Sequence, residues 1–524
     1  MTEISNVSRV LTHMGYAIRK DSLTAPQIQD LRKQLTVAPK AAGRFAKQGE
    51  SFTVFMESGS RFYCPRMWAR DMYGEAEGNI IVDGESLRSD LPFVGTPYEY
   101  QVAIVNQFIA ANANGLICVP CGRGKTFMAI NIAAKLGKKF LIVVDKEFLL
   151  QQWAGELKAL MPGIKIGIIQ ENIKQISSET IYPKSPTLDE LKQKAKDAKL
   201  KSSGTKDELI KRFIAANIKY IEDPKVIEYD CCIAMIQTLV QRDFAETDFR
   251  PFGLTIFDEC HHLGASNFSR ALLKVQTKHM LGLSATPTRD DGLTKVFEWF
   301  LGKPVYWEKI READPNVIVR KIDFDSEDDK YTNVPTDWQG ETVLARLLTQ
   351  VVECEERNEV IDGLLADLVK DSKRRILVLS ERKSHLERIE KGLPKGTTIG
   401  YYIGGMKEEV REEGAKSAQV LLGTYAMASE AMNIKTLNTM IMASPRKKIE
   451  QSTGRILRTR KDEREVEPLI IDIVDSHDVY QSQWGKRKAY YKRCAYKIEG
   501  EPEKKEKTKA DPLAGLTGCM MIED

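Results

Sequence analysis

A short glycine-containing loop between an apolar run and a helical pattern constrains this fold most tightly. The chain reads Val-Pro-Cys-Gly-Arg-Gly-Lys-Thr over residues 119–126. The apolar run 115–119 leads into the loop, and the segment 127–136 follows it with apolar residues at helical spacing. Strand, tight loop and helix in this order bring backbone N–H groups and the positive end of a helix to one point. The loop therefore predicts an α/β domain that binds a phosphate.

The side chains of this loop also suit a nucleoside triphosphate. Glycine lets the backbone approach a phosphate, Lys125 supplies a mobile positive charge, and the Thr126 hydroxyl is a ligand for Mg²⁺. Val119 stands where the strict phosphate-loop pattern has a glycine, so a turn followed by a capped helix is the alternative for this loop taken alone. The residues expected to contact the nucleotide are Pro120, Cys121, Gly122, Arg123, Gly124, Lys125 and Thr126.

Length and composition predict a globular protein of several domains. The chain has 524 residues, of which 42% are hydrophobic and 29% charged, and its formal net charge is +4. We expect three or four domains, and any nucleic-acid surface to be local. No run has the pattern of a signal peptide or a membrane span, which predicts a soluble protein of the cytoplasm or nucleus. The nine cysteines and six histidines lack zinc spacing, which favours reduced thiols.

Two series of short apolar runs alternate with helical segments, as in parallel α/β domains. The first series has expected strands at 116–119, 140–144, 232–235, 254–257 and 280–284. The second series has expected strands at 375–379, 399–403, 420–423, 439–443 and 469–474. The predicted fold class is therefore α/β, with two tandem domains.

The predicted domain boundaries follow from these series. The two α/β domains are expected at 91–310 and 341–480, joined by a linker at 311–340 that is rich in Asp, Pro and Thr. Residues 1–90 are expected to form a small mixed accessory domain, and 481–524 a basic, partly disordered extension. The basic and aromatic stretch within that extension could stack on bases, but a solvated helix with inward tyrosines is favoured.

Acidic and hydroxyl side chains follow two expected strands of the first domain. In open parallel sheets, ligands bind at the carboxyl ends of strands, which places Asp258 and Glu259 at the edge where the phosphate loop lies. Asp258 can hold Mg²⁺, and Glu259 can orient and deprotonate an attacking water. A charged turn is the alternative, and His261 is as well explained as a hydrogen-bonded turn residue. The hydroxyls of Ser284 and Thr286 could relay a change at the phosphate.

The expected second domain contains Gln-Ser-Thr-Gly-Arg-Ile-Leu-Arg at 451–458. Arg455 and Arg458 are three residues apart, so they are expected to project from one face of a helix. Arginine suits bidentate contact with phosphate, and two arginines supplied from a facing domain would act as arginine fingers. A basic surface helix is the alternative.

An insertion at 173–228 interrupts the first α/β domain and is too long for a simple connection. Two Thr-x-x-Glu capping boxes begin at Thr187 and Thr205. They predict helices at 188–199 and 206–215, whose leucines and phenylalanine can form a small core. The insertion is therefore expected to fold as a unit of its own.

Taken together and in order, these motifs resemble those of superfamily 2 helicases. The resemblance covers residues 93–475. It rests on the segments 98–101, 120–126, 143–153, 234–239, 258–261, 284–287, 404–405, 423–437 and 451–458. The sequence Gly-Leu-Ser-Ala-Thr-Pro-Thr-Arg-Asp-Asp-Gly at 282–292 resembles the xeroderma pigmentosum group B-type branch. That branch is similar to phage recombination-repair helicases and to helicases of large cytoplasmic DNA viruses, including the poxvirus transcript-release helicase.

The resemblance implies two RecA-like domains that use ATP and Mg²⁺. It implies catalytic roles for Lys125, Asp258, Glu259, Arg455 and Arg458. It implies that Gln101 reads the adenine, although Tyr98 stands where an arginine is usual. It implies coupling roles for His261, Ser284, Thr286, Glu430, Asn433 and Gln451. Asn433 and Ala431 replace the Asp and Gly of the usual Glu-Gly-Leu-Asp-Ile pattern.

The insertion resembles a SAP motif, a helix–loop–helix module that usually binds DNA. The resemblance implies DNA contacts by Lys192, Lys194, Lys201, Ser203, Gly204, Thr205 and Lys206. A helical spacer with solvated lysines is the alternative. The function expected is an ATP-dependent DNA helicase or translocase with no membrane partner. An RNA helicase or transcript-release factor, and a DNA-binding scaffold with an idle ATPase, are the alternatives.

Overall fold

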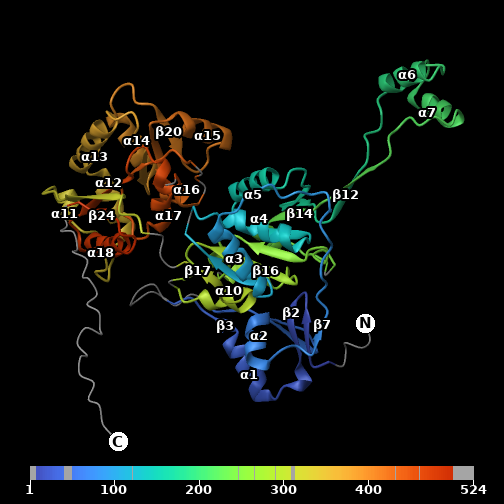
Figure 1. Ribbon diagram of the computed structural model, residues 1–524, viewed down its shortest axis with the longest axis horizontal. Helices are drawn as coiled ribbons and strands as arrows, with labels where there is room; N and C mark the ends of the chain where they lie inside the picture. The colour runs from blue at the N-terminus through green and yellow to red at the C-terminus, as the bar shows by residue number, and fades with distance from the viewer. Residues whose placement is uncertain are drawn as a thin grey trace, which may run out of the picture. The chain divides into compact units, whose positions relative to one another are not determined.

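The computed structural model divides the chain into two compact units, Met1–Lys309 and Ile310–Asp524 (Figure 1). It describes residues 7–40, 50–120, 122–245, 247–264, 266–289, 291–308, 313–430, 432, 434–459 and 461–499. Each unit is built on a largely parallel sheet with helices on both faces, and the two form the tandem RecA-like domains that the sequence predicts.

The N-terminal unit begins with a small mixed domain. Its five-stranded sheet consists of β1 (Arg9–Thr12), β2 (Gly15–Arg19), β5 (Met56–Glu57), β6 (Arg61–Cys64) and β7 (Gly78–Asn79). A second pair, β3 (Thr36–Val37) and β4 (Phe52–Thr53), lies beside α1 (Ala25–Gln34) and α2 (Arg66–Tyr73). These strands and helices form the small mixed domain that the sequence predicts at this end of the chain.

The sheet of the first α/β domain has eight strands. They are β8 (Asn114–Cys118), β9 (Phe140–Val144), β10 (Ile166–Gln170), β11 (Ile173–Lys174), β14 (Cys231–Met235), β15 (Leu254–Phe257), β16 (His279–Ser284) and β17 (Pro304–Trp307). Their order is β11-β10-β14-β9-β15-β16-β8-β17, and every pairing except that of β10 with β11 is parallel. The expected strands match this sheet to within two residues at their ends.

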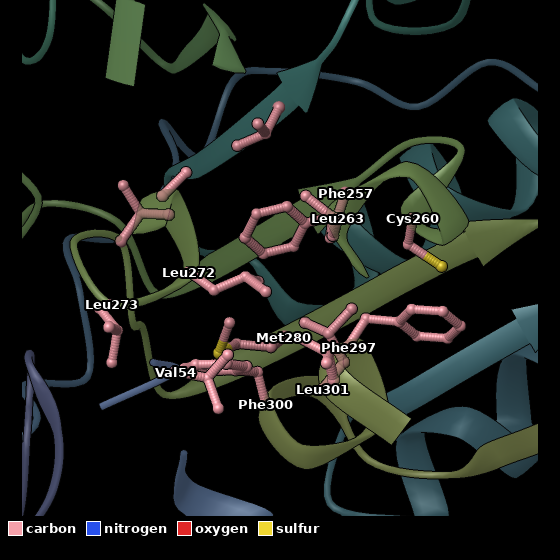
Figure 2. Close-up of a cluster of buried hydrophobic side chains, with 14 of the residues drawn as sticks. Val54, Phe257, Cys260, Leu263, Leu272, Leu273, Met280, Phe297, Phe300 and Leu301 are labelled. Carbon is pink, nitrogen blue, oxygen red and sulfur yellow. The ribbon is translucent and has the colours of Figure 1, made fainter. Parts of the chain in front are cut away.

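Helices bury both faces of this sheet because its strands are apolar on both sides. The first face packs against α3 (Glu99–Ala110), α4 (Lys125–Leu136) and α5 (Glu147–Leu160). The second packs against α8 (Ile236–Gln241), α9 (Ser266–Leu272) and α10 (Thr294–Leu301). Figure 2 shows the core on the second face, where Val54 of the small domain joins Phe300 of α10. The small domain and the first α/β domain therefore share one core.

The insertion forms a helical pair on a two-stranded ribbon. The ribbon is antiparallel and consists of β12 (Ser178–Ile181) and β13 (Lys225–Glu228), with Ile181 opposite Lys225. Between them lie α6 (Leu188–Asp197) and α7 (Lys206–Ala215). Leu191, Ala195, Leu209 and Phe213 form a small buried core of their own. The two capping boxes and both helices agree with the sequence prediction.

The sheet of the C-terminal unit has seven strands. They are β18 (Ile318–Phe324), β19 (Ile376–Ser380), β20 (Ile399–Tyr402), β21 (Val420–Thr424), β22 (Thr439–Met442), β23 (Leu469–Asp475) and β24 (Lys497–Ile498). Their order is β20-β21-β19-β22-β23-β18-β24, with parallel pairings. Strand β18 comes from the region expected to be the linker, and β24 from the expected extension. Both pair in the sheet, so this domain is longer at each end than its sequence pattern indicates.

Helices also cover both faces of the second sheet. One face packs against α12 (Leu344–Glu353), α13 (Glu355–Leu368) and α14 (Lys383–Gly392). The other packs against α16 (Tyr425–Glu430), α17 (Glu450–Thr453) and most of α18 (Asp478–Arg493). In α18, Arg487 donates to both carboxylate oxygens of Asp472 at 2.7 and 2.8 Å, and Tyr491 is fully buried. The basic, aromatic stretch of the expected extension is thus a packed helix with inward tyrosines, the favoured interpretation.

Candidate active site

Four neighbouring strands of the N-terminal unit bring the expected site residues to one edge of the sheet. The strands β9, β15, β16 and β8 are adjacent and parallel, so the loops at their carboxyl ends meet. These loops carry Asp145, the pair Asp258 and Glu259, Ser284 and the phosphate loop respectively. The arrangement gathers residues from positions 120 to 284 of the chain.

The phosphate loop turns sharply before α4. Gly122 and Gly124 have φ of +86° and +76°, in the left-handed region that favours glycine. Gln101 packs against Gly124: its amide nitrogen donates to the carbonyl of Arg123 at 3.3 Å, and its oxygen accepts from the Tyr98 backbone N–H at 2.9 Å. Gln101, the residue expected to contact the adenine, is therefore buried and holds the loop in place. Cys121 lies outside the described residues.

A matched pair of glycine substitutions tests the shape of this loop. A Cβ at Gly124 would lie 2.4 Å from the Gln101 amide nitrogen, whereas a Cβ at Gly137 (φ +61°), which ends the same helix, meets nothing within 4 Å. Both changes to alanine introduce left-handed strain of about 1–2 kcal/mol, but only Gly124→Ala displaces Gln101. We expect Gly124→Ala to lose ATP binding in a fluorescent-nucleotide titration and Gly137→Ala to retain it. Equal affinities would contradict this view of the loop.

Lys125 and the two carboxylates form a compact charged cluster. The Lys125 ammonium lies 3.0 Å from Glu259 Oε1. Trp153, buried on α5, donates its indole N–H to Asp258 Oδ2 at 2.8 Å. The other oxygen of Asp258 accepts from the Glu259 backbone N–H at 2.9 Å. Glu259 has φ of +42°, a strained conformation for a residue with a side chain.

The electrostatics of this cluster separate the two carboxyl groups. Burial and the neighbouring Glu259 raise the pKa of Asp258 to about 6. Burial also disfavours ionised Glu259, but the Lys125 ammonium and the nearby histidines outweigh it and lower its pKa to about 2. Titratable groups whose pKa values are separated by burial and by specific charged neighbours mark a candidate functional site.

Two observations test whether ATP and Mg²⁺ suit these residues. Oε2 of Glu259 is buried and accepts no hydrogen bond from the residues that the structure describes, which leaves it available to a water. The Asp258 carboxylate would gain a compensating charge from a cation. The residues present therefore fit a nucleotide and a metal: Thr126 and Asp258 are the residues that would hold Mg²⁺, and Lys125 is the one that would contact the phosphates.

His261 lies between Glu259 and the strand β16, and it hydrogen-bonds to Ser284 of that strand. The His261 Nδ1 lies 3.0 Å from the Ser284 hydroxyl and 3.4 Å from Glu259 Oε2. The same hydroxyl accepts from the Thr286 backbone N–H at 3.1 Å. Burial lowers the pKa of His261 to about 4, so the imidazole is neutral at physiological pH. The structure brings together these three expected coupling residues.

The C-terminal unit holds the remaining expected residues. Residues 454–457 form a 3₁₀ helix rather than an α-helix. Arg455 is buried and donates to the Met432 carbonyl at 2.8 Å, while Arg458 is half-buried. The expectation that both arginines project from one face of a helix is therefore wrong. The Arg455 side chain points into the interior of its own domain. Gln451 is half-buried on α17. Asn433 and the side chain of Glu430 lie outside the described residues.

The insertion presents its expected contact residues unequally. Lys201, Ser203, Gly204 and Thr205 are exposed in the bend between its helices. Arg212 donates to the Lys201 carbonyl at 2.8 Å and to that of Ser203, which holds this bend.

The lysines of the insertion differ in what they contact. Lys194 is exposed and donates to the Tyr220 carbonyl at 3.1 Å, while Lys192 lies 3.8 Å from Asp189. Lys206 is half-buried at the start of α7. Gly204 has φ of +125°, and a Cβ there would lie 2.3 Å from Glu208 Oε2.

Sequence reasoning missed three contacts of the site. Trp153 was placed in a motif but not against Asp258. Asp145 lies 2.5 Å from Nδ1 of His262, and the Arg123 guanidinium lies 4.1 Å from the centre of the Tyr100 ring. Their signal in the sequence is weak, since each depends on which helices and strands pack side by side.

Two family models match the two α/β domains. The family described as "Type III restriction enzyme, res subunit" matches residues 95–289, and "Helicase conserved C-terminal domain" matches 356–461. L396 of Acanthamoeba polyphaga mimivirus, assigned as an ATP-dependent RNA helicase, is 30% identical over 94% of this chain and 87% of its own.

Two more distant relatives also come from viruses and phages. QP509L of African swine fever virus, also assigned as an ATP-dependent RNA helicase, is 26% identical over 72% of this chain and 68% of its own. Helicase D10 of Escherichia phage T5 is 25% identical over 73% of each chain.

No described helix has the length and hydropathy needed to cross a bilayer. The chain belongs to the superfamily 2 helicases of the branch found in phages and large DNA viruses, enzymes that hydrolyse ATP and act on nucleic acid.

Proposed function

We propose that this enzyme is an ATP-dependent DNA helicase or translocase. The observation that carries the choice of DNA is the SAP-like insertion, whose helices, capping boxes and small core are complete in themselves. Its bend offers exposed Lys201 beside backbone N–H groups at the start of α7, a combination that suits a phosphodiester backbone.

In the proposed mechanism, residues of both units act on ATP. Backbone N–H groups of the phosphate loop and Lys125 hold the phosphates, Thr126 and Asp258 hold Mg²⁺, and Glu259 takes a proton from the attacking water. Binding of ATP would draw Lys125 away from Glu259, which frees that carboxylate as a base. Arg458 from the second domain stabilises the charge on the transferred phosphate, and Arg455 positions the segment that carries Arg458.

Coupling uses the contact of His261 with Ser284 of β16. When Glu259 changes its contacts, His261 and the Ser284 hydroxyl change theirs, and Thr286 carries this change to the chain that leads away from the site. Glu430, Asn433 and Gln451 are the proposed counterparts in the second domain. Repeated cycles of binding and hydrolysis then move the strand in steps.

The second candidate function is an RNA helicase or transcript-release factor. The assignment of L396 and QP509L as RNA helicases favours it. An idle ATPase on a DNA-binding scaffold is less favoured, because Lys125, Glu259 and Arg458 are all in place.

The register of the ribbon provides a clean test of the insertion. Ile181 and Lys225 face each other, so residues 182–224 can be replaced by Asn-Gly, which closes a two-residue hairpin. We expect this variant to bind duplex DNA at least tenfold more weakly than the intact enzyme. Each lost phosphate contact should also flatten the dependence of log affinity on log salt by about 0.9.

Substitution of two lysines shows whether the loss of DNA binding comes from the charges of the insertion or from deleting its fold. Lys201→Ala/Lys206→Ala should reproduce part of the loss, whereas Lys158→Ala/Lys391→Ala removes two charges from exposed helices elsewhere and should not. Unchanged DNA affinity of the deletion variant across a salt series would overturn the DNA assignment and leave the spacer interpretation. Fluorescence anisotropy with labelled DNA and RNA duplexes gives both readouts.

A further inference from the structure

A cavity in the C-terminal unit belongs to none of the sites described above. Its volume is about 320 Å³, at the lower end of the range of small-molecule sites. It lies where β19 and β22 end, because Glu381 follows the first strand and residues 445–448 follow the second. The remaining walls come from α12 and from the first turns of α18.

The walls of this cavity combine apolar and polar surface. Leu344 and Leu348, one turn apart on α12, line one side, and Leu344 is 51% exposed. Tyr480 and Gln483 line another. Tyr480 is only 3% exposed, and its hydroxyl and the Gln483 Oε1 are buried without a hydrogen-bond partner among the described residues. Buried polar atoms without partners are costly, so a ligand that hydrogen-bonds to both would be stabilised here.

The rim of the cavity is positively charged. Arg446 is paired with Glu381 and lies 5.3 Å from the Tyr425 ring centre, so its charge is largely satisfied within the domain. Lys447 and Lys448 are exposed and follow it in the chain. The lining therefore carries an excess of positive charge beside an apolar slot with two hydrogen-bonding atoms.

We propose that this cavity takes one nucleotide of a single-stranded nucleic acid. The base enters between the leucines and Tyr480, where the hydroxyl and the Gln483 amide meet its polar edge. The flanking phosphates lie on Lys447 and Lys448. The proposal deepens the proposed function and rests on its strand-binding step, but not on the choice of DNA over RNA.

The test measures binding of fluorescein-labelled 20-nucleotide strands by the full chain. The strands are oligothymidine, oligouridine and a strand of the same length built from abasic nucleotides. Tyr480→Phe removes one hydroxyl and should weaken binding of the first two strands about three- to tenfold. It should leave binding of the abasic strand unchanged. Lys447→Ala/Lys448→Ala should flatten the salt dependence on all three strands by about 0.7 for each lysine.

Lys416→Ala/Lys486→Ala is the matched control, since both lysines are exposed in the same unit and neither lines the cavity. Wild-type binding by Tyr480→Phe, or an equal loss on the abasic strand, would overturn insertion of a base. An unchanged salt slope in the lysine variant would overturn the phosphate contacts. Failure of the DNA assignment would show separately, in the variant that lacks residues 182–224, while the cavity variants would still respond on oligouridine.

Discussion

Glu259→Gln should bind ATP but hydrolyse it at least about a hundredfold more slowly than the wild type. The amide keeps the size of the side chain but cannot take a proton from water, and loss of a general base costs about 10²- to 10⁴-fold in rate. The same change removes the ion pair of Glu259 with Lys125 at 3.0 Å, so Lys125 remains available to phosphate and nucleotide affinity should not fall. Single-turnover hydrolysis and nucleotide titration measure the two effects.

Glu156→Gln on α5 is the control for this substitution, because it removes a carboxylate from the same unit outside the charged cluster. It should hydrolyse ATP at the wild-type rate. Turnover by Glu259→Gln close to that rate would exclude Glu259 as the residue that activates water. If Glu259→Gln loses both nucleotide binding and turnover, the result would instead indicate that the cluster around Lys125 has collapsed.

Arg458→Ala should lower the rate of hydrolysis by about a thousandfold or more with nearly intact nucleotide binding. An arginine that stabilises the transferred phosphate is worth about 10³- to 10⁵-fold in rate. Arg458→Lys should recover little, because an ammonium cannot reproduce the bidentate geometry of a guanidinium. The half-buried side chain of Arg458, in contrast with buried Arg455, makes it the better candidate for contact outside its own domain.

Arg455→Ala provides an informative contrast. Because Arg455 donates to the Met432 carbonyl, its removal should lower the stability of the C-terminal unit as well as the rate, whereas the main effect of Arg458→Ala should be on the rate. Arg493→Ala, at the exposed end of α18, should change neither. Wild-type hydrolysis by Arg458→Ala would contradict a role for the second domain in the chemical step.

Much of the fold is predictable because buried parallel strands are short apolar runs. Strands β9 and β15 begin and end where the sequence indicates, and the capping boxes locate α6 and α7. Strand β18 is not predictable in this way, since three charged residues interrupt its apolar ones within an Asp-rich stretch. The segment 342–369 contains two helices broken at Cys354, where no proline or glycine marks the break.

The parts of the site that local motifs define are predictable from the sequence. The contacts that depend on which strands and helices pack together are not. The loop, the acidic pair and Ser284 each follow an apolar run, so their common edge can be inferred from a parallel sheet alone. The indole of Trp153 reaches Asp258 only because α5 packs against β14 and β9, and β9 is the neighbour of β15 in the sheet. The inward turn of Arg455 depends on the 3₁₀ geometry of 454–457, which the helical spacing of the two arginines does not reveal.

We expect nucleic acid, and DNA in preference to RNA, to drive ATP hydrolysis at this site. The most direct measurement is the rate of ATP hydrolysis with single-stranded DNA, duplex DNA, forked DNA and RNA at one salt concentration. Glu259→Gln serves as the background. We expect at least one form of DNA to stimulate hydrolysis strongly and RNA to stimulate it more weakly. Stimulation by RNA alone would contradict the DNA assignment, and hydrolysis that no nucleic acid stimulates would contradict the coupling between the site and the strand.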